Sequence, residues 1–125
     1  MRSKFPKIIL SGNPISTQHA YGQHGKIRFM KKIAKELKES YRVESLTAWR
    51  RKPLFENLEV EIHLFFGNKR VRDWDNYHKI SMDALTGIVW IDDSQIKKAT
   101  IFVDYDKINP RIEIIVNTLP VASSI

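Results

Sequence analysis

Residues 58–66 read Leu-Glu-Val-Glu-Ile-His-Leu-Phe-Phe, and this stretch decides the fold. Apolar side chains occupy every second position, with Glu59, Glu61 and His63 between them. Because side chains alternate between the two faces of a β-strand, the pattern predicts a strand with one face in the core. Gly67-Asn68 ends it. His63 lies on the polar face, and we assign it no function.

Apolar spacing on either side of this strand predicts two helices and three further strands. We expect strands at 5–10, from residue 99 to 105, and over 112–116, the last two joined by a turn at 106–110. Helical spacing predicts helices from 26 to about 41 and from 76 to about 88, whereas 15–25 and 42–56 look like loops. The order β-α-β-α-β-β indicates an α+β fold with a mixed sheet. We expect one domain over residues 1–118 and a frayed tail at 119–125.

The charge is unevenly distributed along the chain. The net charge is +7, but residues 1–52 hold 13 Lys and Arg against 3 acidic residues, whereas 53–125 hold 8 against 11. A basic first half suits a polyanionic partner, although a merely basic soluble protein would show the same balance. The absence of cysteine excludes disulfides, zinc-thiolate sites and cysteine nucleophiles. No apolar run reaches membrane-spanning or signal-peptide length, so we expect a cytoplasmic protein with no membrane partner.

Two aspartates stand two residues apart in segment 69–79, which reads Lys-Arg-Val-Arg-Asp-Trp-Asp-Asn-Tyr-His-Lys. In an extended segment Asp73 and Asp75 point the same way and Trp74 points to the opposite side. Converging carboxylates favour a hard divalent cation, Mg²⁺ or Mn²⁺. The same residues could instead form a polar turn in which Asp75 or Asn76 caps the next helix. The spacing excludes an EF-hand, because positions 78 and 84 hold His and Ala rather than Gly and Glu.

Other residues could complete a site for a phosphate ester. Lys79 should lie one helical turn beyond the aspartate pair, and Asp92-Asp93 is the obvious source of a third carboxylate. Cations that could contact a nucleic-acid backbone are Arg28, Lys31, Lys32 and Lys35 on the first helix and Lys69, Arg70 and Arg72 before the aspartates. A solvated helix face is the other meaning of the helical lysines. Trp49, within a basic loop, could either stack on a base or cover the core.

Two blocks of residues resemble the RusA-type Holliday junction resolvases. They are Arg72-Asp73-Trp74-Asp75-Asn76 with Lys79 and Asp83-Ala84-Leu85, and then Asp92-Asp93-Ser94-Gln95-Ile96. The resemblance is close over about residues 70–97. It implies a Mg²⁺- or Mn²⁺-dependent homodimeric endonuclease that nicks two opposed strands of a four-way DNA junction. At matching positions, the family's three catalytic, metal-binding aspartates fall on Asp73, Asp75 and Asp93, and its essential lysine falls on Lys79.

The remaining matches imply supporting roles. Asn76 and Asp92 match neighbouring family positions, where we expect them to support the site rather than react. Asp83 is positioned to pair with a basic side chain on its own helix, which favours a structural role. Trp74 departs from the smaller aliphatic residue usual in the family. A junction- or duplex-binding protein that does not cleave, and a nuclease for other branched nucleic acids, are the alternative functions.

Overall fold

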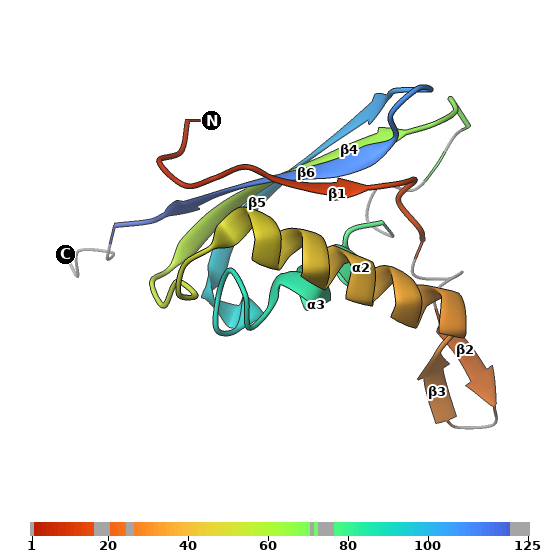
Figure 1. The fold of residues 1–125 in the computed structure, drawn as a ribbon, viewed down its shortest axis with the longest axis horizontal. Coiled ribbons are helices and arrows are strands. Elements are labelled where there is room, and N and C mark those ends of the chain that lie inside the picture. The colour runs from red at the N-terminus through yellow and green to blue at the C-terminus, as the bar shows by residue number, and fades with distance from the viewer. Residues whose placement is uncertain (1, 17–20, 25–26, 71, 73–76, 121–125) are drawn as a thin grey trace.

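Strand β4 (Leu58–Phe66) lies inside a four-stranded mixed sheet with the order β1-β6-β4-β5. The computed structural model describes residues 2–16, 21–24, 27–70, 72 and 77–120. Strand β4 pairs antiparallel with β6 (Arg111–Thr118) and parallel with β5 (Ile96–Tyr105), while β1 (Ile8–Ser11) pairs antiparallel with β6. Strand β5 therefore forms one edge of the sheet (Figure 1).

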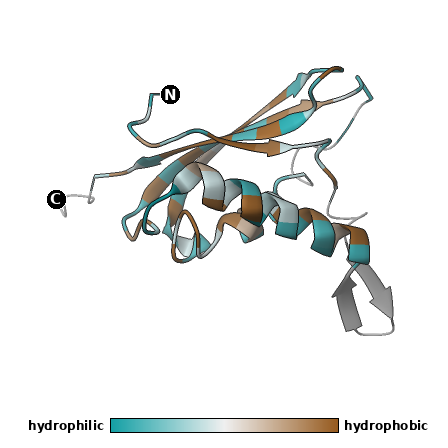
Figure 2. Ribbon diagram, in the orientation of Figure 1, coloured by the Kyte–Doolittle hydropathy of each residue, from teal (hydrophilic) through white to brown (hydrophobic). Residues whose placement is uncertain are grey.

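Both helices lie on the same side of this sheet (Figure 1). They are α2 (Lys32–Trp49) and α3 (Lys79–Leu85). Apolar and polar residues alternate along the strands (Figure 2), and β1, β4 and β6 each bury one face beneath the helices. The largest fully buried side chains are those of Trp49, Trp90 and Tyr41, and the apolar face of β4 is buried along its whole length. Neither described helix is long and apolar enough to cross a membrane.

The predicted fold class is confirmed. The described chain has two helices and a mixed four-stranded sheet, and its main elements follow the order β-α-β-α-β-β. A short hairpin of β2 (Tyr21–His24) and β3 (Ile27–Met30) precedes α2 and is separate from the main sheet. The prediction of an uninterrupted loop over 15–25 was wrong at β2. Part of the predicted tail, residues 121–125, lies outside the described residues.

The limits of the first helix were also predicted wrongly. The helix was expected over 26–41 but covers 32–49, because residues 27–30 form β3. Its second half faces the core through Tyr41, Ser45 and Trp49, spaced four residues apart. The polar Ser45 interrupts the apolar pattern in the sequence. Its burial costs little free energy, because its hydroxyl donates a hydrogen bond to the carbonyl oxygen of Tyr41 at 2.6 Å.

The second helix is shorter than the predicted range of 76–88, because regular helix covers only 79–85. The turn that follows positions Trp90, which forms isolated bridges with Leu54 and Thr86.

Trp49 covers the core rather than stacking on a base, since it is 2% exposed and its Nε1 donates to the carbonyl oxygen of Lys52. Strand β5 begins at Ile96, three residues before the predicted start.

Candidate active site

A cleft of about 430 Å³ lies between α3, the turn before β5 and the inner face of β4 and β5. Its apolar floor is lined by Val60, Ile62, Ile96, Ala99 and Ile101, and its polar rim by His78, Lys79, Asp83 and Asp93. Helix α3 has only 7 residues, so it packs on β4 but leaves the inner face of β5 uncovered. The cleft is this uncovered strip of sheet.

Lys79 and Asp83 form an ion pair one helical turn apart on the rim. Lys79 Nζ lies 3.7 Å from Asp83 Oδ2, and the two side chains are 48% and 30% exposed. A half-exposed pair at this spacing stabilises a helix by only a few tenths of a kcal/mol. Its main effect is on orientation, because Asp83 holds the ammonium group beside the cleft. The sequence favoured pairing of Asp83 with an arginine or lysine, and its partner is Lys79.

Asp92 and Asp93 serve different purposes, although they are adjacent. Asp92 is the N-cap of a short 3₁₀ helix, η2 (Asp93–Gln95), and its Oδ2 accepts hydrogen bonds from the backbone N–H of Ser94 and from the Ser94 hydroxyl. The hydroxyl, followed by the backbone N–H groups of Ser94 and Asp93, holds the pKa of Asp92 below its usual range. Asp92 therefore holds the turn as a carboxylate, and Asp93 lines the cleft.

Gln95 connects this turn to the loop between α2 and β4. Its Oε1 accepts from the backbone N–H groups of Ile91 and Asp92, each at 2.9 Å. Its Nε2 donates to the carbonyl oxygens of Leu54 and Glu56 at 2.8 and 2.9 Å. Sequence reasoning gave Gln95 no role, yet a signal was present: Asp92-x-x-Gln95 is a capping box.

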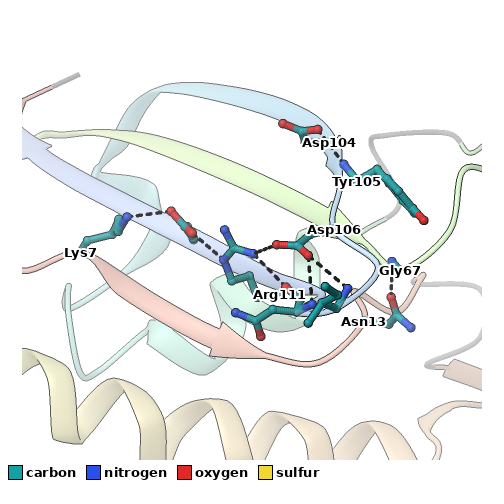
Figure 3. Close-up of polar contacts among 10 residues, drawn as sticks. Lys7, Asn13, Gly67, Asp104, Tyr105, Asp106 and Arg111 are labelled. Atoms are coloured by element: carbon teal, nitrogen blue, oxygen red, sulfur yellow. Dashed lines mark hydrogen bonds and ion pairs between the residues drawn. The ribbon is translucent and has the colours of Figure 1, made fainter.

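The aspartate pair lies outside the described residues, as does Asn76. The segment that leads to it begins at Gly67, whose N–H donates to Asn13 Oδ1 at 2.8 Å (Figure 3). The next fixed point is Arg72. Its guanidinium donates to Asn68 Oδ1 at 2.6 Å and lies 4.2 Å from the centre of the Phe66 ring. Arg72 is thus held against the end of β4, and it ties the start of the aspartate segment to the sheet.

Several predicted DNA-contacting residues gather near the start of α2. A hollow of about 290 Å³ is lined by Ile33, Arg70, Arg72 and Tyr77, among others. Lys31, Lys32 and Lys35 are exposed in the first turn of the same helix and just before it, and Lys69 Nζ lies 5.1 Å from the Tyr105 ring centre. Lys32 approaches Glu36 only to 3.9 Å in an open position, a contact of little energetic weight. The side chain of Arg28 lies outside the described residues.

A charged network at the far end of the sheet is structural. Arg111 bridges Asp106 and Glu113 at 2.8 and 2.6 Å, and Lys7 reaches Glu113 at 2.9 Å (Figure 3). Burial raises the pKa of Glu113, but hydrogen bonds from Lys7 and Arg111 outweigh it and hold that pKa below its ordinary value. The network fixes the turn between β5 and β6, away from the cleft.

The structure thus brings Lys79, Asp83 and Asp93 together at one cleft, while Asp92 supports the turn behind it. Within the part of the chain that the structure describes, no three metal-ligating side chains cluster. The family described as Endodeoxyribonuclease RusA matches residues 11–117, which include β4, β5, most of β6, both helices and the cleft. This match defines the class of protein as an endodeoxyribonuclease. The chain belongs to the RusA family, as the resemblance indicated. No curated protein matches the chain.

Proposed function

We propose that the protein is a metal-dependent, structure-selective endodeoxyribonuclease that resolves four-way (Holliday) junctions by paired symmetric nicks during DNA recombination and repair. The observation that carries the proposal is the cleft of Lys79, Asp83 and Asp93 on a chain of the RusA family. We place this activity in the cytoplasm, because a chain without cysteine suits a reducing compartment.

Hydrolysis of a phosphodiester builds negative charge on the phosphoryl oxygens and on the leaving oxygen. The ammonium group of Lys79, held at the rim by Asp83, can stabilise that charge at the moment it develops. The apolar floor of the cleft lies beside this ammonium group. The carboxylate of Asp93 carries no compensating cation among its described contacts and lies across the same cleft.

The proposed cofactor is Mg²⁺, with Mn²⁺ as a substitute. Asp93 offers carboxylate oxygens of the kind that hard cations prefer, and the chain has no thiolate to compete. The family resemblance adds Asp73 and Asp75 as the other ligands, with Asn76 and Asp92 in support. When bound, such an ion would lower the pKa of water and screen the charge of the phosphate.

The test uses a synthetic four-way junction with labelled arms and Mg²⁺. The wild type should make paired nicks in opposed strands, whereas Asp93→Asn and Asp75→Asn should lose nicking and keep junction binding, because they remove negative charge near phosphate. Glu39→Gln, an exposed carboxylate change on α2, is the matched control and should nick normally. Undiminished nicking by Asp93→Asn would contradict the proposed site.

The alternative functions give different results in the same test. A wild type that binds the junction but never nicks it, with an affinity that ignores Mg²⁺, would be a non-cleaving binder. Preferred cleavage of flaps, forks or RNA in a substrate panel would indicate another branched nucleic acid.

Two symmetric nicks require two active sites, and we propose a homodimer that pairs through β5. This ten-residue strand lies at the edge of the sheet and exposes Phe102, Val103 and Tyr105. It begins with lysines at 97 and 98 and carries Asp104 near its end. Antiparallel pairing across a two-fold axis would therefore place the lysines of one copy near the aspartate of the other.

Sedimentation of two matched variants tests this interface. Val103→Lys should produce monomers, because it puts a charge on the pairing strand. Val43→Lys on α2 should remain dimeric, since Val43 is equally exposed (56% against 55%) but lies on a helix. A dimeric Val103→Lys protein would place the interface elsewhere.

A further inference from the structure

A second group of cations surrounds a hollow where α2 ends. The hollow has a volume of about 350 Å³ and is lined by Lys4, Arg51 and Lys52 together with Phe5, Pro53, Leu54, Phe55 and Glu56. All three cationic residues are exposed, and Glu56 is the one acidic residue in the lining. The hollow therefore presents concentrated positive charge on a concave surface.

Aromatic rings hold two of these cations, Lys4 and Arg51. The guanidinium carbon of Arg51 lies 4.8 Å from the centre of the Phe5 ring and 5.6 Å from that of Trp49. Lys4 Nζ lies 5.4 Å from the Phe5 ring centre. Cation–π contacts orient a cation without neutralising its charge. Among the described residues, neither Lys4 nor Lys52 nor Arg51 lies within ion-pair distance of a carboxylate, so the charge stays available for an external anion.

The hollow shares a wall with the candidate active site. Leu54 and Glu56 line the hollow. Their backbone carbonyl oxygens accept the two hydrogen bonds that the Gln95 side chain donates. Gln95 belongs to the turn that places Asp93 in the cleft. An anionic chain with one phosphate in the cleft can therefore continue over this wall into the hollow.

The two basic clusters lie at opposite ends of α2, and α3 lies between these ends along the sheet (Figure 1). An 18-residue helix is about 27 Å long, which corresponds to roughly 8 base pairs of duplex at 3.4 Å per base pair. One cluster surrounds Lys31 to Lys35 at the start of the helix, and the other is the hollow. At this separation they must contact different phosphates.

We propose that Lys4, Arg51 and Lys52 form a second DNA-backbone site, which holds a duplex arm of the substrate beyond the cleft. This inference rests on the proposed function and adds to it a site for an arm distinct from the lysines at the start of α2. The site recognises phosphate through the charges of its three cations, which are suited to backbone contacts rather than to reading bases.

Junction binding measured in EDTA at several salt concentrations tests the site without cleavage. Removing one lysine–phosphate interaction lowers the slope of log K against log salt by about 0.9, so Lys52→Gln should lower it by about 0.9 and Lys4→Gln/Lys52→Gln by about 1.8. Between 50 and 200 mM salt, the affinity of the wild type should then fall by about 12-fold more than that of the double variant. Lys107→Gln, an exposed lysine in the turn after β5, is the matched control and should keep the wild-type slope.

The outcomes separate this inference from the proposed function. If the wild type binds and nicks the junction but the double variant keeps its salt slope, the second site is refuted and the nuclease stands. The same holds if Lys107→Gln lowers the slope as much as Lys52→Gln does. If the wild type neither binds nor nicks the junction, both proposals fall.

Discussion

Replacing Gln95 with alanine should destabilise the protein and misplace Asp93. The side-chain amide makes four hydrogen bonds, two accepted from the backbone of 91–92 and two donated to the backbone of 54–56. Because these segments are far apart in the sequence, the amide joins the α2–β4 loop to the turn before β5. We expect the turn to move when this connection is removed.

The size of the effect follows from the surroundings of each bond. A hydrogen bond contributes about 0.5–1.5 kcal/mol net, and less where water can replace the partner. The N–H groups of Ile91 and Asp92 are exposed, so removing their acceptor should cost little, whereas both carbonyl partners are partly buried. Leu54 also keeps a bond from the N–H of Ile91 at 3.3 Å. The sum is about 2–3 kcal/mol, or roughly 10 °C in melting temperature for a chain of this length.

Thermal and urea unfolding measure this cost. Asn117→Ala is the control because, among the described residues, that amide makes a single hydrogen bond, to the carbonyl oxygen of Arg2. Gln95→Glu should be at least as destabilising as alanine at pH 7, since it sets a carboxylate against two carbonyl oxygens. That arrangement raises the carboxyl pKa in the folded state, so stability should recover as the pH falls through it. At a temperature where Gln95→Ala is folded, nicking should fall about ten- to hundred-fold. A melting temperature equal to that of Asn117→Ala would refute the reasoning.

Three further predictions concern single side chains. Lys79→Met should change the free energy of unfolding by less than about 0.5 kcal/mol but lower the single-turnover rate of nicking by about 100-fold or more. A variant whose lost nicking is explained by its lost stability would contradict the proposed role of Lys79. Arg111→Gln should lose stability most at neutral pH, because the pKa of Glu113 is depressed in the folded state. In thermal unfolding from pH 7 to 2.5, the difference in stability from the wild type should shrink as Glu113 becomes protonated. A difference that does not change with pH would contradict this role of Arg111. Thr86→Val removes the acceptor of the buried Trp90 indole N–H at 3.0 Å and should cost about 1–3 kcal/mol by urea unfolding, whereas Thr86→Ser should cost much less.

The sequence could predict those parts of the fold that depend on local pattern. Strand β4 alternates so regularly that its limits, Leu58 and Phe66, were predicted without error. The strand order was beyond reach, because β6 lies between β1 and β4 through pairing with residues far along the chain. The extent of α2 was missed for a related reason: Ser45 is buried through a bond to the backbone that the hydrophobic pattern does not record.

The candidate site likewise has residues that the sequence could indicate and contacts that only the fold shows. Residue types indicated Lys79 and the Asp92-Asp93 pair, and the family resemblance singled out Asp93. Only the fold brings Lys79 and Asp93 to one cleft, because the turn at 86–95 returns the chain to the start of β5. The separate role of Asp92 depends on a hydroxyl two residues later, and the role of Gln95 depends on carbonyl groups about 40 residues earlier. Their side chains alone could not show which partner each would find.

The short helix α3 leaves the cleft open, whereas β5 forms an edge of the sheet because it pairs with β4 alone among the described strands. Helix α3 has only 7 residues, and the apolar residues of β5 on the face that bears the helices remain open. Ala99 and Ile101 line the floor of the cleft, and Val103 and Tyr105 remain exposed further along the same strand. Apolar surface left open in this way costs stability unless something covers it. In the proposed enzyme the substrate covers the floor of the cleft, and the second subunit covers the exposed end of β5.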